Sequence, residues 1–291
     1  MTLKSYLTSK YTASTVKSYE REIRIYLQAC PNAQSATYQD IINYINTQRK
    51  QQNPSSINRI LQSIKKYYNY LVDRELREDN PAQFINLKDT KRRNNTVQKR
   101  LLSSTEIQEL WQHFLDKKYR YKILRNKNLS MISLLLFQGL RGGEVRRLSI
   151  ENINLEQTQI YIPKSHDSSA RTLALEPCQI LPLYQYIYQD RIELLKGDSK
   201  EKALFISKLG RADNGETLHY LIESNRHIIK GKTINPKTIR MSVIAEQFKK
   251  GKSLQEVQYF AGHRYPSSTE RYKSNHLQAL QQGILKHHPL K

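Results

Sequence analysis

The sequence is poor in cysteine and has no long hydrophobic run. Its two cysteines, Cys30 and Cys178, belong to no Cys-x-x-Cys pair or histidine-rich stretch, so neither a zinc site nor a disulfide framework is supported. The longest apolar run, Met131–Phe137, is interrupted by Ser133 and is much too short to span a bilayer. The first residues, MTLKSYLTSKY, lack the apolar core of a signal peptide. We therefore expect a cytoplasmic protein with reduced thiols and no membrane contact.

Acidic residues are also scarce relative to basic ones. The chain has 48 Lys and Arg residues and 26 Asp and Glu residues, which gives a formal net charge of +22 at pH 7. Residues 1–100 contain 18 basic and 8 acidic residues, and the remainder contains 30 and 18, so the imbalance extends along the whole chain. Solubility alone does not require so large an excess. A chain that is basic in both halves is typical of a protein that surrounds a polyanion, and the expected partner is double-stranded DNA.

The first part of the chain shows helical periodicity. One helix is expected to begin at Ser14, a candidate N-cap, and a second is expected over Asp40–Arg49. A third begins with the strong start signal Asn-Pro-Ser-Ser and extends over Asn53–Arg74. These helices predict a small all-helical domain over residues 1–87. Three basic residues on its polar faces are candidate DNA contacts: Arg59, Lys65 and Lys66.

A polar stretch follows this domain. Residues 88–100 have no apolar period and are rich in basic side chains, so we interpret them as a basic linker, although a solvated loop without a role is the alternative. Within the linker, Lys91, Arg92 and Arg93 are candidate DNA contacts. A second domain is then expected over residues 101–291.

The second domain is expected to be mainly helical around a small β-sheet. Helix signals occur over Thr105–Phe114, Asn128–Phe137, Arg141–Leu148, Gln179–Leu195, Thr217–Ile229, Pro236–Phe248 and Leu254–Phe260, and another helical turn starts at Ser267. Strands are predicted at Thr158–Ile162 and Arg171–Leu175 on either side of the loop Pro163–Ala170, with Ala203–Ser207 as a candidate for a further short strand. The expected fold class is therefore mainly α with a small β-sheet: a helical domain followed by a mixed α/β domain.

Four short motifs occur in order in the second domain. They are Gly139-Leu-Arg-Gly-Gly-Glu-Val-Arg-Arg-Leu148, Lys237-Thr-Ile-Arg240, Phe260-Ala-Gly-His263, and a Ser/Thr run that leads to Tyr272. Together they resemble the catalytic domain of tyrosine recombinases, the phage-integrase and Xer family, whose first box has the pattern Gly-Leu-Arg-x-x-Glu-Leu-x-x-Leu. The first domain resembles the core-binding domain of that family, including its Asn-Pro-Ala sequence at Asn80–Ala82. Each motif is weak by itself, but their order and spacing are specific.

The resemblance implies catalytic roles for several residues. Arg141 and Arg240 would hold the scissile phosphate, which agrees with the ability of guanidinium groups to donate paired, charged hydrogen bonds to a pentacoordinate phosphorane. Tyr272 would be the nucleophile; the pKa of a free phenol is about 10, and nearby cations lower the cost of forming the phenolate. His263 would bond a phosphate oxygen and help to take the phenolic proton. Glu144 would support the first arginine structurally.

Two positions depart from the family pattern. Lys164 lies where the family has the lysine that protonates the leaving 5′-oxygen, but its loop lacks the common Gly-Lys-Gly sequence. An ordinary hairpin lysine is the alternative, and His166 is a less favoured substitute. Lys237 stands where the family usually has histidine, and it is similar to the lysine of type IB topoisomerases. A lysine can donate to a phosphate oxygen, but it does not serve as a neutral acid or base near pH 7 unless its pKa is depressed.

The resemblance implies a site-specific DNA recombinase that needs neither a metal nor another cofactor. Four protomers on two specific DNA sites would form 3′-phosphotyrosine links and exchange strands through a Holliday junction. A type IB topoisomerase, favoured by Lys237, and a catalytically silent DNA-binding factor are the alternatives. The chain ends in an apolar stripe, which would either dock into a neighbouring protomer or pack on its own domain: Leu277, Leu280, Ile284 and Leu285.

Overall fold

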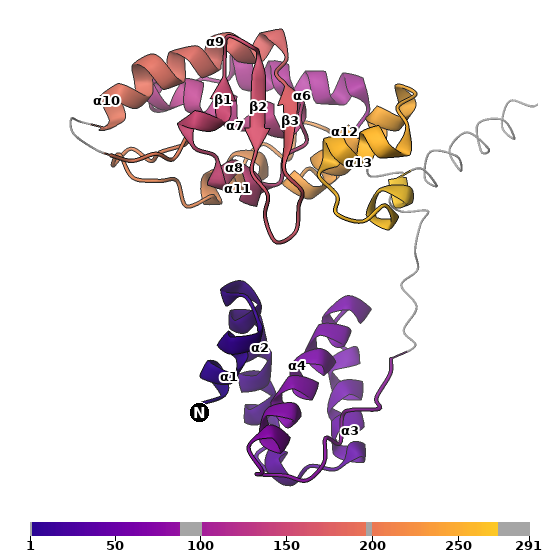
Figure 1. Ribbon diagram of the computed structural model, residues 1–291. Coiled ribbons are helices and arrows are strands. Elements are labelled where there is room, and N and C mark those ends of the chain that lie inside the picture. The colour runs from indigo at the N-terminus through magenta and orange to yellow at the C-terminus, as the bar shows by residue number, and fades with distance from the viewer. Residues whose placement is uncertain (1, 88–100, 196–199, 273–291) are drawn as a thin grey trace, which may run out of the picture. The chain divides into compact units, whose positions relative to one another are not determined.

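The computed structural model describes residues 2–87, 101–195 and 200–272. The chain divides into two compact units, Met1–Arg93 and Asn94–Lys291 (Figure 1). Each unit has its own cluster of buried hydrophobic side chains. The predicted fold class is confirmed, because the described residues are mainly helical and include a three-stranded antiparallel sheet. Among these residues, no helix is both long and apolar enough to cross a membrane.

The first unit is built from helices. Its described elements are α1 (Leu3–Lys10), α2 (Ala13–Ala29), a 3-10 turn (Ala33–Ser35), α3 (Tyr38–Arg49) and α4 (Pro54–Asp73). The predicted start of α4 is confirmed: Asn53 accepts a hydrogen bond from the backbone N–H of Ser56, and Pro54 occupies the first turn, where no N–H donor is needed. The predicted cap of α2 is wrong, because Thr12 occupies the N-cap and Ser14 lies inside the helix.

Helix α1 was not predicted, because it is stabilised by contacts with a distant part of the chain and not by a local sequence pattern. It buries only Tyr6 and Leu7, which is too few residues to produce a clear helical period. The hydroxyl of Tyr6 donates a hydrogen bond of 2.6 Å to Asp73 at the end of α4. Buried tyrosines also connect the other helices, since the hydroxyl of Tyr26 on α2 lies 2.6 Å from that of Tyr68 on α4. These bonds satisfy phenols that would otherwise be costly to bury.

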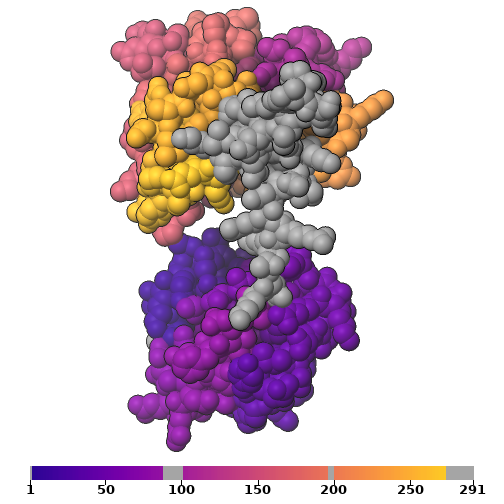
Figure 2. All heavy atoms as spheres, turned by 90° about the vertical axis from the view of Figure 1, so that its right-hand side faces the viewer, coloured from indigo at the N-terminus to yellow at the C-terminus, as the bar shows by residue number. Residues whose placement is uncertain are grey.

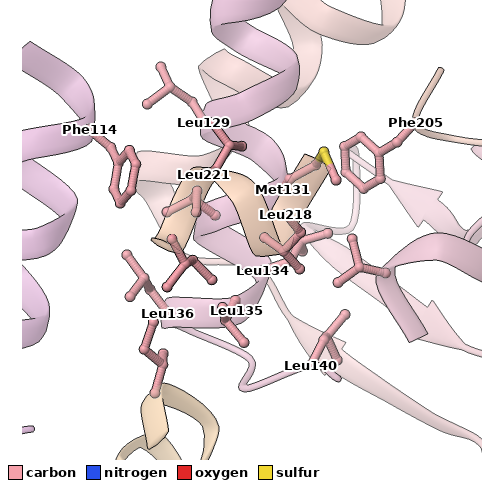
Figure 3. Packing of buried hydrophobic residues seen from close by; sticks show 14 of the residues in the cluster. Phe114, Leu129, Met131, Leu134, Leu135, Leu136, Leu140, Phe205, Leu218 and Leu221 are labelled. Atoms are coloured by element: carbon pink, nitrogen blue, oxygen red, sulfur yellow. The ribbon is translucent and has the colours of Figure 1, made fainter. Parts of the chain in front are cut away.

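The second unit packs its helices around α7. The described elements are α6 (Ser104–Asp116), a 3-10 turn (Lys122–Leu124), α7 (Arg125–Leu136), α8 (Gly142–Arg147), a 3-10 turn (Ile150–Asn152), α9 (Pro177–Gln185), a π-helical segment (Tyr186–Asp190), α10 (Arg191–Leu195), α11 (Glu216–Glu223), α12 (Pro236–Lys249) and α13 (Leu254–Ala261). The chain is helical again over residues 267–272. Every residue of α7 from Lys127 onward is buried, and side chains from α6, α11 and the segment around Phe205 converge on it (Figure 3).

The sheet covers one side of this helical core. Strands β1 (Ile153–Asn154), β2 (Gln159–Ile162) and β3 (Arg171–Ala174) pair antiparallel in the order β1-β2-β3, with Ile162 opposite Arg171. Both predicted strands are confirmed, and β1 was not predicted. The hairpin between β2 and β3 extends beyond the sheet on the side of α8 (Figure 1).

Two predictions for the second unit are wrong in part. The candidate strand at Ala203–Ser207 is absent from the described chain, where only isolated bridges involve Ala203 and Ile206. The helix expected over Thr217–Ile229 ends at Glu223, because the side-chain amide of Asn225 donates to the carbonyl of Leu221 and competes with the helical backbone.

Candidate active site

Arg240 is the centre of the site. It lies in the first turns of α12, whose start is set by the Asn235 side chain, and it is 7% exposed. Its Nη1 donates to the carbonyl of Gly139 at 2.6 Å, and its Nη2 donates to the carbonyl of Ala261 at 2.5 Å. Burial, together with the charge of Arg141, lowers the pKa of Arg240 to about 10, so the guanidinium remains charged at neutral pH. One side chain therefore joins the segment after α7, helix α12 and the end of α13.

The two carbonyls are presented by turns that require glycine. Gly139 follows α7 with φ of +60°, and Gly262 caps α13 with φ of +63°. A Cβ atom at Gly262 would also lie 2.2 Å from Nη1 of Arg171. These glycines of the first and third motifs thus allow the backbone to approach Arg240 and Arg171 closely.

His263 and Tyr272 form the second part of the site. Their rings are stacked, with centroids 5.9 Å apart and an interplanar angle of 20°. Nδ1 of His263 lies 2.9 Å from Oγ1 of Thr269, and its Nε2 lies 3.3 Å from Nη2 of Arg240. Because arginine only donates, Nε2 is the acceptor, and the ring proton is then on Nδ1 and donated to Thr269.

The surroundings of His263 keep it neutral. Burial, followed by the charges of Arg240 and Arg141, lowers its pKa to about 4.

Helix α12, helix α13 and Tyr272 share a small buried cluster, and the orange and yellow surface of these segments is continuous in Figure 2. The third and fourth motifs are therefore brought against the second.

Arg141 enters the site from the N-cap of α8. Its backbone N–H donates to Oε2 of Glu144 at 2.8 Å, so the third residue of the helix caps the N-cap residue as in one half of a capping box. Its side chain is half-buried, and Nη1 donates to the carbonyl of Asp167 in the β2–β3 hairpin at 2.8 Å. The guanidinium is close enough to Arg240 and His263 to lower the pKa of each. The two arginines of the predicted phosphate clamp are therefore brought together.

Glu144 and Arg171 form a buried ion pair beneath the two arginines. Glu144 accepts from Nη1 of Arg171 at 2.9 Å and from Nη2 at 3.1 Å, and it lies 3.8 Å from Nη1 of Arg240. Burial would raise the pKa of Glu144, but the hydrogen bonds and charge of Arg171 outweigh that effect and hold the pKa at about 2. Arg171 was not singled out in the sequence. Its signal is an arginine at an inward position of a predicted strand, where a buried acidic partner is needed.

The two predicted lysines are exposed. Lys164 lies in the β2–β3 hairpin and Lys237 in the first turn of α12, and neither makes a hydrogen bond or ion pair with any residue that the structure describes. The hairpin itself contacts the site, because Ser169 N–H donates to the carbonyl of Gly262 at 3.1 Å and Arg264 donates to the carbonyl of His166 at 2.9 Å. The backbone near Lys164 is thus held at the site while its amine is free to move.

The candidate DNA contacts of the first unit lie on α4. Arg59 is exposed and pairs with Glu22 at 3.0 Å, and Lys65 donates to the carbonyl of Gln83 at 2.9 Å. Lys66 is half-buried, with its amine 5.6 Å from the ring centroid of Tyr11. The remaining candidates lie outside the described residues: Lys91, Arg92 and Arg93 of the linker, and Leu277, Leu280, Ile284 and Leu285 of the tail.

Comparison with known proteins matches both units. Residues 100–278 match the phage integrase family, and residues 3–75 match the phage integrase N-terminal SAM-like domain. Tyrosine recombinase XerD of Oceanobacillus iheyensis is 25% identical over 269 residues, which cover 89% of this chain and 86% of the relative. Tyrosine recombinase XerC of Lactobacillus delbrueckii subsp. bulgaricus is 23% identical over 298 residues, which cover 99% of this chain and 97% of the relative.

A solved structure supports the same fold. The XerH site-specific recombinase, crystallised with a difH substrate in a pre-cleavage complex, matches with a TM-score of 0.69 and 17% identity over 91% of this chain and 78% of that chain. The family match covers more than half of the chain and includes every motif of the site described above. The chain belongs to the phage integrase family and is a tyrosine recombinase, an enzyme that cleaves and rejoins DNA strands in site-specific recombination.

Proposed function

We propose that Tyr272 is the nucleophile of this recombinase. Its phenolic oxygen attacks a phosphorus of the DNA backbone, the bond from phosphorus to the 5′-oxygen breaks, and a 3′-phosphotyrosine and a free 5′-hydroxyl result. The phenolic proton passes to Nε2 of His263. The observation that carries this proposal is the stacking of Tyr272 on His263, whose Nε2 faces Arg240 at 3.3 Å. A neutral imidazole beside two fixed cations suits this step, because it can accept a proton while the cations stabilise the negative charge that develops.

The two arginines hold the phosphate. In the DNA-free chain, Arg240 is oriented by two backbone carbonyls, and Arg141 donates to the carbonyl of Asp167. On DNA, Arg141 exchanges that carbonyl for a non-bridging phosphate oxygen. A site prepared in this way needs little rearrangement when charge develops on the phosphorane.

The two lysines complete the chemistry from the solvent side. Lys164 donates a proton to the leaving 5′-oxygen, and the flexible stem of the side chain lets its amine reach the DNA from an anchored hairpin. Lys237 donates to a phosphate oxygen. Its position three residues before Arg240 on α12 places both side chains on the same side of the helix.

The recombinase binds specific duplex sites through both domains, which we assign to residues 1–87 and 101–291, with residues 88–100 as the linker. The binding of specific sites is supported by two similar structures, since XerH was crystallised with its difH substrate and the lambda integrase on a COC' core site. Basic contacts to phosphates come from Arg59, Lys65, Lys66, Lys91, Arg92 and Arg93. A homotetramer in the cytoplasm pairs two sites and exchanges strands through a Holliday junction, with the apolar stripe of the tail docking between protomers.

A nicked suicide duplex tests the nucleophile. The target site is first obtained by binding selection from randomised duplexes, and a duplex nicked near the cleaved phosphate then traps the covalent complex. Wild-type protein is expected to give a protein–DNA band on a denaturing gel, and Tyr272→Phe should bind the duplex equally well and give none. Tyr265→Phe is the matched control, because Tyr265 is exposed and lies in the same segment. A covalent band from Tyr272→Phe would overturn the assignment.

A further inference from the structure

Arg171 is the one fully buried arginine at the site, and it cannot reach DNA. Its side chain is 0% exposed, and the side chain of Glu144 is 1% exposed. It begins β3 opposite Ile162, at an inward position that a strand of this sheet otherwise fills with an apolar residue. Burying this charge is costly unless it is paired and hydrogen-bonded, and its partner is Glu144. The pair therefore requires an explanation beyond ordinary packing.

Glu144 is in contact with both arginines of the phosphate clamp. It accepts from the backbone N–H of Arg141 at 2.8 Å, and its Oε2 lies 3.8 Å from Nη1 of Arg240. The two bonds from Arg171 satisfy the carboxylate from the other side. Without Arg171, the closest remaining positive charge to this buried carboxylate is Arg240. An unpaired carboxylate would then compete with the phosphate for Arg240.

Arg171 also supports the segment that carries His263. Its guanidinium lies directly beneath Gly262, so closely that a Cβ atom there would be 2.2 Å from Nη1. On the same side, Ser169 N–H donates to the carbonyl of Gly262 at 3.1 Å, and Nη1 of Arg171 lies 3.5 Å from the carbonyl of Ser169. One guanidinium therefore contacts the first motif, the hairpin of Lys164 and the turn that precedes His263.

We infer that Arg171 is a positioning residue for cleavage: its bidentate pairing with Glu144 keeps that carboxylate away from Arg240 and holds the Gly262–His263 turn in place. The inference rests on the proposed function, because it assumes that Arg240 and His263 act on the scissile phosphate. Arg171 itself touches no DNA and transfers no proton. A purely structural ion pair would instead affect only how much of the protein is folded.

The test separates the rate constant from the fraction of active protein. Excess nicked suicide duplex is mixed with enzyme in a single turnover, so that the amplitude counts active sites and the rate constant reports on each site. The variants are Arg171→Met, Arg171→Lys and the double variant Arg171→Met with Glu144→Gln. Arg191→Met is the matched control, because Arg191 is also buried in this domain but, among the described residues, donates only to the carbonyls of Glu201 and Ala203.

Arg171→Met is expected to bind DNA with unchanged affinity and to cleave it about tenfold more slowly per active site. This loss is smaller than the about 10²–10³-fold loss that is typical when a direct charge-stabilising donor is removed. Arg171→Lys should recover only part of the rate, since lysine lacks the planar fork that pairs with both carboxylate oxygens. The double variant should be faster than Arg171→Met, because the competing carboxylate is gone. Lowering the pH should reduce the difference in rate constant between Arg171→Met and wild type. Protonation of Glu144 in the variant removes the competing negative charge, as the Glu144→Gln substitution does.

Arg191→Met should lose amplitude or thermal stability without any change in the rate constant. If Arg171→Met gives too little folded protein, Arg171→Lys decides alone: a wild-type rate constant in that variant would overturn the inference. So would an Arg171→Met protein that loses amplitude only, as Arg191→Met does. If wild-type protein itself forms no covalent complex, the proposed function fails, and this result is distinct from either outcome above.

Discussion

Acidification is expected to destabilise the catalytic domain through His263. The ring is 6% exposed, and burial with the charges of Arg240 and Arg141 lowers its pKa from 6.5 to about 4. Unfolding restores the ordinary pKa, so between those two values the unfolded state binds more protons than the folded state, and stability falls as the pH falls. At roughly 1.36 kcal/mol per pH unit, the difference between the two pKa values corresponds to about 3 kcal/mol of unfolding free energy. Most of this contribution is lost by about pH 4.5.

The chain provides its own probe for this measurement. Its single tryptophan, Trp111, is buried on α6 in the catalytic domain against Phe137, so its fluorescence follows the unfolding of that domain alone. Urea titrations at pH 7 and pH 4.5 should show wild-type protein losing about 2–3 kcal/mol more than His263→Gln. His219→Gln, at an exposed position of α11, should behave as wild type. If His263→Gln has the same pH dependence as wild type, His263 is not held neutral by its surroundings.

Two further predictions use the same suicide duplex. Arg141→Lys and Arg240→Lys should each cleave about 10²-fold more slowly or worse, because an ammonium cannot hold two phosphate oxygens at once, and near-normal rates would contradict the clamp. Lys164→Ala should be slow on an ordinary phosphate but recover on a 5′-bridging phosphorothiolate, whose sulfur leaves without a proton; equal slowing on both substrates would exclude Lys164 as the acid and turn attention to His166.

Local signals predicted most of the helices correctly. Ser103 and Glu106 form a capping box at the start of α6, and Asn53 with Pro54 starts α4. These motifs act over three or four residues, so a single sequence contains all the information they need. Helix α1 depends instead on a contact with the distant residue Asp73, and the early end of α11 depends on the competing side chain of Asn225. The periodicity of apolar residues contains no information about either effect.

The site shows the same division. The motif residues Arg141, Arg240, His263 and Tyr272 were all predicted, and the structure brings them together, although their catalytic roles stay predictions. Arg171 was missed because its pairing with Glu144, 27 residues earlier, depends on where the fold places the start of β3 relative to α8. In the sequence alone, Arg171 is one of 48 basic residues.

In the proposed mechanism, a lysine at position 237 still leaves the site with a neutral base, because that base is His263. Its side chain is exposed at the start of α12, whereas His263 is buried, neutral and stacked on Tyr272. The proton on Nδ1 of His263 is directed to Thr269, which leaves Nε2 as an acceptor in the site. Under the proposed function, His263 takes the phenolic proton, so this role does not fall to position 237. Under the proposed function, position 237 has to supply a hydrogen-bond donor to the phosphate, and the ammonium group of a lysine is such a donor.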